Sequence, residues 1–380
     1  MLETNELEGM KKIKVIHVIP SLAKGGAERI VLDSCIELSK RKEIEICLVT
    51  FYTKNEYFFL SESINHKVIE SKVTPSFMGK HKINTAELQN FIEKYQPDII
   101  HLHLFESIMV FSQVTYSQAK YIIHFHNNIP QFSSFDFKQK LTKKIATNLY
   151  EKYLVIKKIK KLKTTFIAIS QNSFNYITNN VPKYFEKKLL QNAIDLNRFN
   201  SNSIAKENRL ITIGSLLINK NHQLCIDVVF ELHKCGYKIF LDILGDGPEY
   251  DVLLKKIKDY KLENFITLYG KVDFPEHYLK QASIYLHTAI NEAFGLVLIE
   301  AMAAGLPVIC TDAGGNRDII ENGKNGFIIK SRNPTEIANK IIELLNNDSK
   351  RIEMGNYARQ FAQKYDIKNY VDELIKIYKV

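Results

Sequence analysis

The chain has 380 residues and a formal net charge of +10 at pH 7. A chain of this length exceeds the size at which a single hydrophobic core keeps growing, so we expect two domains. Its 45% hydrophobic and 25% charged residues are typical of globular proteins, and this composition excludes a fibrous or a disordered chain.

Cysteine usage and hydropathy predict where the protein works. The five cysteines are odd in number and show no C-x-x-C spacing, so neither a disulfide framework nor a zinc site is expected. The first residues, MLETNELEGMKK, are polar and acidic, unlike a secretory signal. The longest apolar stretch, residues 295–310, is too short for a membrane span. We therefore expect a cytoplasmic protein.

The first half of the chain alternates predicted strands with helices. Apolar runs predict strands at residues 14–19, 44–50, 98–104, 121–125 and 165–169. Apolar residues at helical spacing follow the first strand, and residues 138–161 predict a long amphipathic helix. This alternation favours a parallel sheet with helices on both faces.

The alternation resumes after a polar segment, residues 200–209, which we interpret as a linker. Strands are predicted at residues 210–213, 238–244, 266–269, 284–287 and 307–310. Helices are predicted at residues 248–260, 295–304, 335–345, 351–364 and 367–378. The expected fold class is therefore α/β, with two doubly wound Rossmann-like domains that face each other across a cleft. Ligands bind at the carboxyl ends of the strands in this architecture.

The most informative stretch is residues 291–307, NEAFGLVLIEAMAAGLP. Glu292 precedes a predicted helix and Glu300 lies within it. A helix start offers unpaired N–H groups and the positive end of the helix dipole, which attract phosphate. A carboxylate in the following turns can accept hydrogen bonds from ribose hydroxyls. The spacing alone is a weak signal, because it arises often by chance on any helix, and a surface salt bridge is the alternative for Glu300.

The longer stretch NEAFGLVLIEAMAAGLPVICTDAGGNRDII resembles the signature of the retaining glycosyltransferases with the E-x7-E motif and the GT-B fold (glycosyl transferases group 1, family 4). The resemblance extends over nearly the whole chain. Other matching segments are IPSLAKGGAERIVLD, PDIIHLH, IIHFHN, QNAIDLNRF, LDILGDGPE and NGFII. It implies transfer of a hexose or N-acetylhexosamine from a nucleotide-diphosphate sugar, with UDP or GDP, to a glycan or lipid-linked acceptor. It also implies retained anomeric configuration, no cofactor, and a place in surface polysaccharide or glycoconjugate synthesis.

By this resemblance the second domain binds the donor. Glu300 would bind the ribose, and Glu292 would contact the hydroxyls of the transferred sugar. The amides of Gly295 and Leu296 would bind the diphosphate, and Lys220 would neutralise it.

In the first domain, the resemblance implies that Gly25 and Gly26 let a loop approach the phosphates without a clashing Cβ. His126 would lie at the edge of the sugar pocket. The remaining strand-end histidines are expected to be satisfied by their neighbours: His101, His103 and His124. These clustered histidines could also suggest a metal site, but we expect no metal, because this fold binds diphosphate with amides and cations.

The chain departs from the family pattern at three places. Ser215 stands where an arginine is usual, Ala193 replaces the glycine at the domain junction, and Arg317-Asp318 replaces a proline-glutamate pair. The donor site therefore lacks one expected cation. Either Arg29 or Arg317 assists Lys220, or donor affinity is modest.

The domain division that we predict is an acceptor-side domain over residues 1–199 and a nucleotide-sugar-binding domain over residues 200–365. Residues 366–380 are expected to form a C-terminal helix that crosses back to the first domain.

Positive charge is concentrated in the first half of the chain. Residues 1–195 carry 28 Lys and Arg against 19 Asp and Glu, whereas the remainder carries 24 against 23. The stretch from Lys138 to Lys163 is the densest, with ten lysines and a single acid, Glu151. A basic amphipathic helix of this kind can lie on an anionic membrane surface. A core-packed helix with a solvated outer face is the alternative.

Three other functions compete with sugar transfer. A sugar-nucleotide epimerase of GT-B-like shape would bind the same donor, but the GGAE loop and the complete E-x7-E stretch favour a transferase. The basic charge would permit nucleic-acid binding, but no recognised module is present and no nucleic-acid partner is expected. No G-x-G-x-x-G follows the first strand, which argues against a dinucleotide-dependent dehydrogenase.

Overall fold

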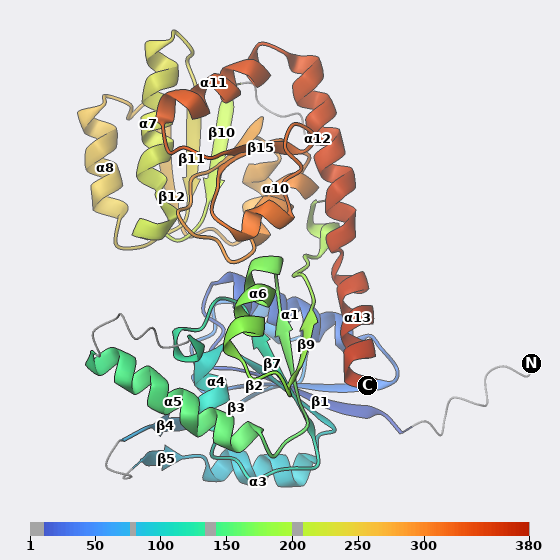
Figure 1. The fold of residues 1–380 in the computed structure, drawn as a ribbon. Coiled ribbons are helices and arrows are strands. Elements are labelled where there is room, and N and C mark those ends of the chain that lie inside the picture. The colour runs from blue at the N-terminus through green and yellow to red at the C-terminus, as the bar shows by residue number, and fades with distance from the viewer. Residues whose placement is uncertain (1–10, 77–80, 134–141, 200–207, 380) are drawn as a thin grey trace, which may run out of the picture. The chain divides into compact units, whose positions relative to one another are not determined.

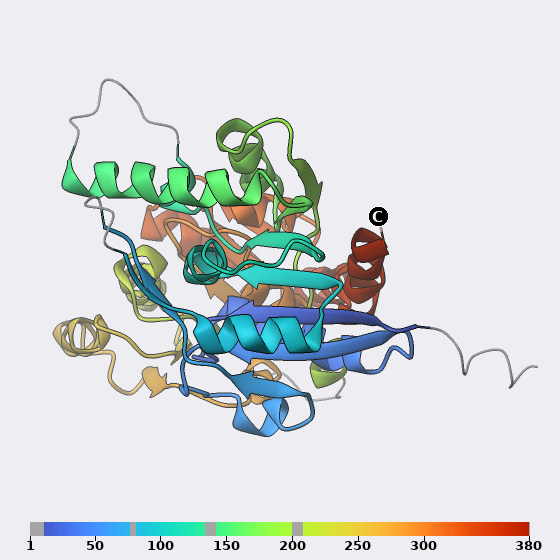
Figure 2. The same ribbon diagram turned by 90° about the horizontal axis from the view of Figure 1, so that it is seen from below.

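The computed structural model describes residues 11–76, 81–133, 142–199 and 208–379. These residues form two compact units, each an α/β layer structure (Figures 1 and 2). The first unit contains the described residues up to Asn192 together with those from Ile367 onward, and the second runs from Ala193 to Asp366. The predicted α/β class with parallel sheets in two domains is confirmed.

The division falls earlier in the chain than predicted. Residues 193–199, expected to end the first domain, belong to the second unit. The Ile194 N–H donates to the Tyr365 carbonyl at 2.9 Å, and Arg198 forms ion pairs with two glutamates of the second unit. Most of the predicted linker, residues 200–207, lies outside the described residues.

The first unit is built on a seven-stranded parallel sheet. Its order is β3-β2-β1-β6-β7-β8-β9. The strands are β1 (Ile13–Ile19), β2 (Ile44–Thr50), β3 (His66–Val68), β6 (Ile99–His103), β7 (Lys120–Phe125), β8 (Thr164–Ala168) and β9 (Glu186–Leu189). A separate antiparallel pair consists of β4 (Lys72–Thr74) and β5 (Lys82–Asn84). The strand order reverses between β1 and β6, which is where ligands bind in doubly wound sheets.

Helices flank this sheet on both faces (Figure 2). They are α1 (Gly26–Ser39), α2 (Phe58–Ser61), α3 (Ala86–Tyr95), α4 (Leu104–Phe111), α5 (Lys143–Ile159), α6 (Gln171–Asn180) and α13 (Ile367–Lys379), with a 3₁₀ turn η1 (Pro130–Phe132). The C-terminal helix α13 belongs to this unit and packs beside α1, where Arg41 and Asp372 form an ion pair at 3.0 Å. Residues 138–141 of the helix predicted at 138–161 lie outside the described residues, and α5 begins at Lys143.

Side chains alternate across the central strands, because successive residues of a strand point to opposite faces. On one face Ile16, Val18, Ile100 and Leu102 join a buried apolar cluster. The intervening positions on the other face include several buried histidines. The two faces of this sheet therefore have different chemistry.

The second unit has a six-stranded parallel sheet of order β12-β11-β10-β13-β14-β15. The strands are β10 (Arg209–Ile213), β11 (Phe240–Leu244), β12 (Ile266–Gly270), β13 (Ile284–His287), β14 (Val308–Thr311) and β15 (Gly326–Ile329). The helices are α7 (His222–Lys234), α8 (Tyr250–Asp259), α9 (Pro275–Leu279), α10 (Leu296–Ala303), α11 (Pro334–Leu345) and α12 (Asp348–Ala362). The 3₁₀ turns are η2 (Leu196–Phe199), η3 (Ile218–Lys220), η4 (Gly315–Asp318) and η5 (Gln363–Tyr365). Here the strand order reverses between β10 and β13.

None of the helices in the described parts of the chain has the length and apolar character needed to cross a membrane. The cytoplasmic location inferred from the sequence stays a prediction.

Candidate functional site

Three loops of the second unit meet at the carboxyl ends of β10, β13 and β14, which are neighbours in the sheet. Backbone hydrogen bonds join them. The Ile290 N–H donates to the Asn219 carbonyl at 2.8 Å, the Glu292 N–H donates to Ala313, and the Gly315 N–H donates back to the Glu292 carbonyl. The predicted donor residues on these loops are thereby held beside the reversal in strand order.

The structure brings Lys220 and Glu292 together. Lys220 Nζ lies 2.6 Å from Glu292 Oε2, and His287 Nε2 lies 3.3 Å from the same oxygen. Burial would raise the pKa of Glu292, but the nearby His287 ring and the Lys220 charge outweigh it and lower the pKa to about 2. Glu292 is therefore ionised at neutral pH. Sequence reasoning missed His287, which ends β13 five residues before the glutamate.

The helix after Glu292 begins as predicted. Gly295 is its N-cap, with φ of +102°, and Leu296 is the first residue of α10. A side chain at position 295 would be strained in this left-handed conformation, and its Cβ would lie 2.9 Å from Leu298 Cδ1. The N-terminus of α10 therefore follows directly on the Lys220–Glu292 pair, and within its first turn the Leu298 N–H donates to the Gly295 carbonyl at 2.9 Å.

Glu300 lies on α10 and is mostly buried. Arg198 Nη1 approaches Glu300 Oε1 at 3.4 Å, while Arg198 Nη2 approaches Glu276 Oε2 at 2.9 Å. The salt bridge considered for Glu300 thus exists, but it is largely buried, with both side chains 12% exposed. Arg198 was not predicted as a site residue, although it lies in the junction segment QNAIDLNRF.

The loop after β10 packs closely against the loop after β11. Gly245 has φ of +142°, and a Cβ there would lie only 1.9 Å from the Gly214 carbonyl oxygen, so glycine is required. His222, the first residue of α7, is buried next to Gly214, and within the described structure neither of its ring nitrogens has a hydrogen-bond partner. Burial, with the nearby His287 and Lys220, lowers the pKa of His222 to about 4.

Both arginines that were considered as substitutes for the missing cation already pair with an aspartate. Arg317 donates to both oxygens of Asp312 at 2.8 and 2.7 Å, and Arg29 donates to both oxygens of Asp33 at 3.0 and 2.8 Å. Ser215 is exposed at the carboxyl end of β10. In this structure, therefore, Lys220 faces Glu292 while both arginines are neutralised by their own aspartates.

In the first unit, the glycine pair follows β1. Gly25 is the N-cap of α1 with an extended backbone (φ −165°), which any residue can adopt, and Gly26 begins the helix. A Cβ at Gly25 would meet Glu28 Oε2 at 2.3 Å, and the Tyr57 hydroxyl donates to the Gly25 carbonyl at 3.3 Å. Because this contact is with the flexible end of the Glu28 side chain, which can move aside, neither the backbone conformation nor the packing requires glycine at position 25.

His126 follows β7 and is one of five clustered, buried histidines. The other members are His17, His101, His103 and His124. Neighbouring side chains satisfy both ring nitrogens of His101 and His103 and one of His124. Two groups of three among the five have ligand atoms within 4.8 Å of one another. Sequence reasoning missed His17, whose signal was its position on the strand next to β6 and on the same face.

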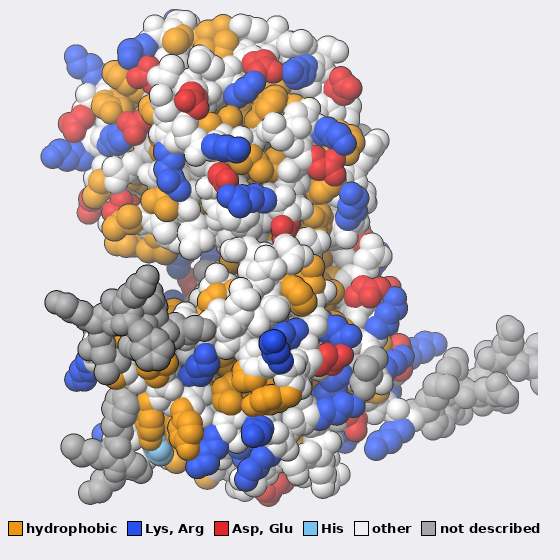
Figure 3. All heavy atoms as spheres, viewed as in Figure 1, with side chains coloured by type: hydrophobic (Ala, Val, Ile, Leu, Met, Phe, Trp, Pro, Cys, Tyr) orange, Lys and Arg blue, Asp and Glu red, His pale blue; other side chains and the backbone are white. Residues whose placement is uncertain are grey.

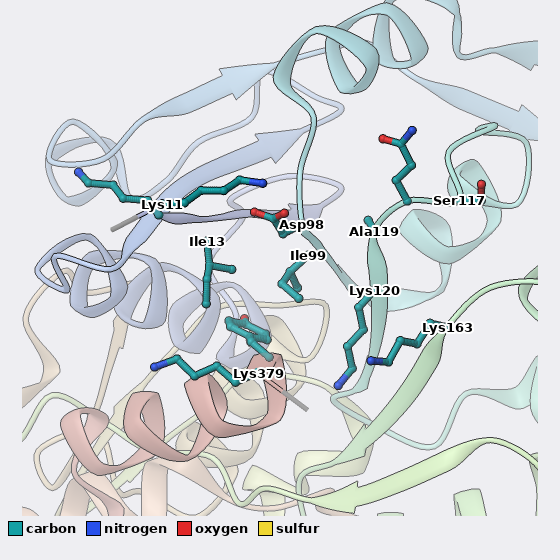
Figure 4. A pocket seen from close by; sticks show the side chains of 12 residues that line it. Lys11, Ile13, Asp98, Ile99, Ser117, Ala119, Lys120, Lys163 and Lys379 are labelled. Atoms are coloured by element: carbon teal, nitrogen blue, oxygen red, sulfur yellow. The ribbon is translucent and has the colours of Figure 1, made fainter. Parts of the chain in front are cut away.

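A pocket of about 490 Å³ lies at the opposite, amino ends of β1, β6 and β7 (Figure 4). Its lining is rich in lysine: Lys11, Lys12, Lys120, Lys163 and Lys379, with Asp98. Lys120 Nζ donates to the Ile377 carbonyl at 2.6 Å. None of the predicted site residues lines this pocket.

The basic helix α5 anchors one face to the core through Val155 and Ile159. Lys143, Lys144 and Lys157 are exposed. Lys152 is partly buried and donates to the Phe132 carbonyl at 2.7 Å, and its pKa is lowered by burial. Figure 3 shows lysine and arginine side chains among apolar ones on the face of the first unit that carries α5. Lys138 and Lys140 lie outside the described residues.

Comparisons with known proteins identify the family and the fold. The family model "Glycosyl transferases group 1" matches residues 193–361, and "Glycosyltransferase Family 4" matches residues 24–198. An uncharacterized glycosyltransferase of Methanocaldococcus jannaschii is 27% identical over 353 residues, which cover 90% of this chain and 92% of that protein. The Campylobacter jejuni N-acetylgalactosamine-N,N'-diacetylbacillosaminyl-diphospho-undecaprenol 4-alpha-N-acetylgalactosaminyltransferase is 25% identical, covering 94% and 96%.

Five relatives with identities from 31% to 37% match half of this chain or less, and this chain spans less than half of their length. Among solved structures, Anabaena HepE in complex with UDP and glucose aligns with a TM-score of 0.78 at 20% identity, covering 97% of this chain and 99% of that one. The fold is therefore GT-B.

Proposed function

The chain belongs to the group 1 and family 4 glycosyltransferases, and on that premise we propose that it moves a hexose or N-acetylhexosamine from a nucleotide-diphosphate sugar to a glycan or lipid-linked acceptor, with retention. The observation that carries the proposal is the Lys220–Glu292 pair directly before the N-terminus of α10. It combines a cation, an ionised carboxylate and the backbone N–H groups of a helix N-terminus, which suit a diphosphate bonded to a sugar.

Lys220 and the amides of Gly295 and Leu296 are proposed to bind the diphosphate. Negative charge grows on this group as its bond to the sugar breaks, so fixed donors stabilise the transition state more than the ground state. Lys220 Nζ lies 2.6 Å from Glu292 Oε2. The donor phosphates would therefore share or take over this lysine on binding.

Glu292 is proposed to accept hydrogen bonds from hydroxyls of the transferred sugar. With a pKa lowered to about 2, it carries no proton at neutral pH and cannot serve as a general acid. Glu300, kept in place by Arg198, is proposed to accept hydrogen bonds from the ribose. By family resemblance, His126 of the first unit is proposed to lie at the edge of the sugar pocket. Gly25 and Gly26 are proposed to let their loop approach the phosphates.

The proposed reaction is a front-face displacement. The bond between the anomeric carbon and the phosphate oxygen breaks, and the acceptor oxygen bonds to that carbon on the same face. The acceptor's proton passes to the departing phosphate oxygen. No carboxylate pair arranged as nucleophile and acid is needed, unlike in glycoside hydrolysis, because the nucleoside diphosphate is already a good leaving group. Divalent metal is not required in this scheme, since Lys220 and amides face the phosphates.

A panel of nucleotide sugars tests the proposal directly. Release of UDP or GDP, first without and then with candidate acceptors, identifies the donor, and NMR of the product reports the anomeric configuration. Transfer should survive EDTA. An inverted product would overturn retention, activity restored only by manganese or magnesium would overturn the metal-free site, and epimerised donor without transfer would favour an epimerase.

We propose that α5 and its flanking lysines place the acceptor side of the enzyme on an anionic membrane surface. Exposed lysines together with the 57%-exposed ring of Tyr153 suit the headgroup region of such a surface. Membrane docking would also suit a lipid-linked acceptor of the kind named for the Campylobacter relative. Vesicle co-sedimentation should show binding that rises with anionic lipid and falls with salt. Changing Lys157, Lys158, Lys160 and Lys161 to glutamine should weaken this binding. Equal binding by the wild type and the variant would mean that α5 is a core-packed helix with a solvated outer face.

A further inference from the structure

The five buried histidines of the first unit are joined through Tyr378 by short polar contacts. This hydrogen-bond chain runs through His124, His101, Tyr378, His17, His103 and His126, in that order. Three adjacent strands supply four of the histidines, His126 directly follows β7, and α13 supplies the tyrosine (Figure 1). His17 pairs in register with His101, and His103 with His124, so the parallel sheet itself sets the spacing.

Each link has the length of a hydrogen bond. His124 Nδ1 and His101 Nε2 are 3.1 Å apart, and His101 Nδ1 lies 2.8 Å from the Tyr378 hydroxyl. That hydroxyl lies 2.8 Å from His17 Nε2. His17 Nδ1 is then 3.1 Å from His103 Nε2, and His103 Nδ1 is 2.8 Å from His126 Nε2. The two end nitrogens, His124 Nε2 and His126 Nδ1, are buried without a partner in the part of the chain that the structure describes.

Burial keeps the histidines uncharged. It lowers the pKa of His17 and of His126 to about 3, and those of the other three lie well below the usual value. A neutral imidazole has one N–H and one bare nitrogen, so a ring that accepts at one end must donate at the other. Six neutral groups therefore hold six protons, of which five fill the five links and one remains at an end.

These constraints leave two arrangements. In the first, each group donates to the next from His124 toward His126, and every ring carries its proton on Nδ1. In the second, donation runs from His126 toward His124, and every ring carries its proton on Nε2. Tyr378 accepts from one histidine and donates to the other in both cases. If Tyr378 accepted from both, its own buried O–H would lack an acceptor among the described residues, which is unfavourable.

We propose that these six residues form one directed hydrogen-bond chain in which all five histidines share the same tautomer, and that Tyr378, His17 and His103 are positioning residues for His126. The direction of the chain decides whether His126 Nδ1 offers a proton or a lone pair. If the proposed function holds, His126 lies at the edge of the sugar pocket, and a residue of the C-terminal helix then sets which of its ring nitrogens carries the proton there.

A metal ion is the rival explanation for clustered histidines. Two groups of three bring ligand atoms within 4.8 Å of one another. A metal needs several nitrogens to converge on one point, each with its lone pair toward the ion. Here the close contacts are pairwise and sequential along the chain, and they use nitrogens on opposite sides of the same rings, which fits hydrogen bonding.

Long-range proton–nitrogen NMR of ligand-free protein labelled with ¹⁵N-histidine tests the proposal without using activity. The two tautomers give distinct nitrogen shifts, so the five buried rings should show one uniform pattern, all Nδ1–H or all Nε2–H. A mixture of tautomers among the five in the wild-type protein would overturn the proposal, as would a stoichiometric metal ion found by mass spectrometry. This measurement needs no variant and is independent of whether the donor assay succeeds.

Tyr378→Phe removes the central link and separates His124–His101 from His17–His103–His126. The nitrogen shifts of His126 should change, although two rings lie between it and the substitution. Tyr370→Phe is the matched control, because Tyr370 is also buried on α13 but takes no part in the chain. Unchanged His126 shifts in folded Tyr378→Phe protein, or the same change in both variants, would overturn the positioning role of Tyr378.

Discussion

The two units use the same architecture to prepare two different kinds of polar site. In each, a parallel sheet reverses its strand order near the middle, and the candidate residues lie toward the carboxyl ends of the strands beside that reversal. In the second unit these residues are charged and paired: Lys220 with Glu292, and Arg198 with Glu300. In the first unit the corresponding region is filled with neutral histidines.

The difference shows how burial acts on groups with and without partners. Glu292 is buried, but a lysine and a histidine next to it keep the pKa of its carboxyl low, so the charge survives. Among the described residues the histidines have no carboxylate as a hydrogen-bond partner, so burial lowers their pKa and they stay neutral. A charged site suits a diphosphate, whereas a neutral, hydrogen-bonding site suits hydroxyl groups.

The contrast is tested most strongly at Lys220. Replacement by alanine removes the cation expected at the leaving group and should lower kcat/KM by about 10²–10³-fold. Steady-state kinetics with the identified donor measures this effect. Lys324→Ala is a suitable control, because Lys324 is an exposed lysine of the same unit that pairs with Glu321. If the Lys220 variant kept near-normal turnover, another group would have to neutralise the leaving phosphate.

Glu300 should give the next largest effect. Glu300→Ala removes a charge-assisted hydrogen bond to the ribose and should cost roughly 1.5–3 kcal/mol of donor binding, on the order of 10- to 100-fold in Kd. Arg198 retains Glu276 as a partner at 2.9 Å, so the local fold should persist. Calorimetric titration with the nucleotide measures the change, with Glu353→Ala on the exposed side of α12 as the control. Equal affinity in the two variants would remove Glu300 from the nucleotide site.

The sequence predicts the positions of Glu292 and Glu300 in the fold better than it predicts which side chains contact them. The E-x7-E stretch places Glu292 in a loop and Glu300 on the helix that follows it, because a local sequence pattern is enough to predict where a helix begins. The partners lie far away in the chain: Lys220 is brought to Glu292, and Arg198 to Glu300, only when the strands assemble. The same holds for His17, whose role depends on which strand lies next to β1.

Strand prediction shows the same limit. The long apolar strands β1, β2 and β7 were predicted within a residue of their observed bounds, because buried central strands are continuous apolar runs. The edge strands β3 (HKV) and β9 (EKKL) were missed. They are short and rich in lysine, as suits strands that pair on one side only, and their composition resembles that of a loop.

The charge on Glu292 predicts a pH-dependent stability. Its folded pKa of about 2 lies below the ordinary value of 4.5, so it contributes stability that is present above about pH 4.5 and is lost as the pH falls toward 2. Wild-type protein should therefore be more stable than Glu292→Gln at pH 7, and the gap should narrow below pH 4.5. Thermal unfolding at a series of pH values measures both, with Glu353→Gln as the control. A gap that stays constant with pH would mean that the carboxylate is not selectively stabilised in the folded protein.

The smallest effect is expected from placing at position 215 the arginine that the family resemblance leads us to expect there. Ser215 is exposed at the end of β10, so a longer side chain there displaces no core residue. An arginine can bind phosphate with two parallel hydrogen bonds, but its charge would be partly screened by solvent and would join a site that already holds Lys220. Ser215→Arg should therefore lower the donor Kd only about 3- to 10-fold. Ser215→Gln, which adds length without charge, is the control, and the gain should shrink as salt is raised. Equal affinity in the arginine and glutamine variants would show that the donor site of this chain has no use for a second cation at that position.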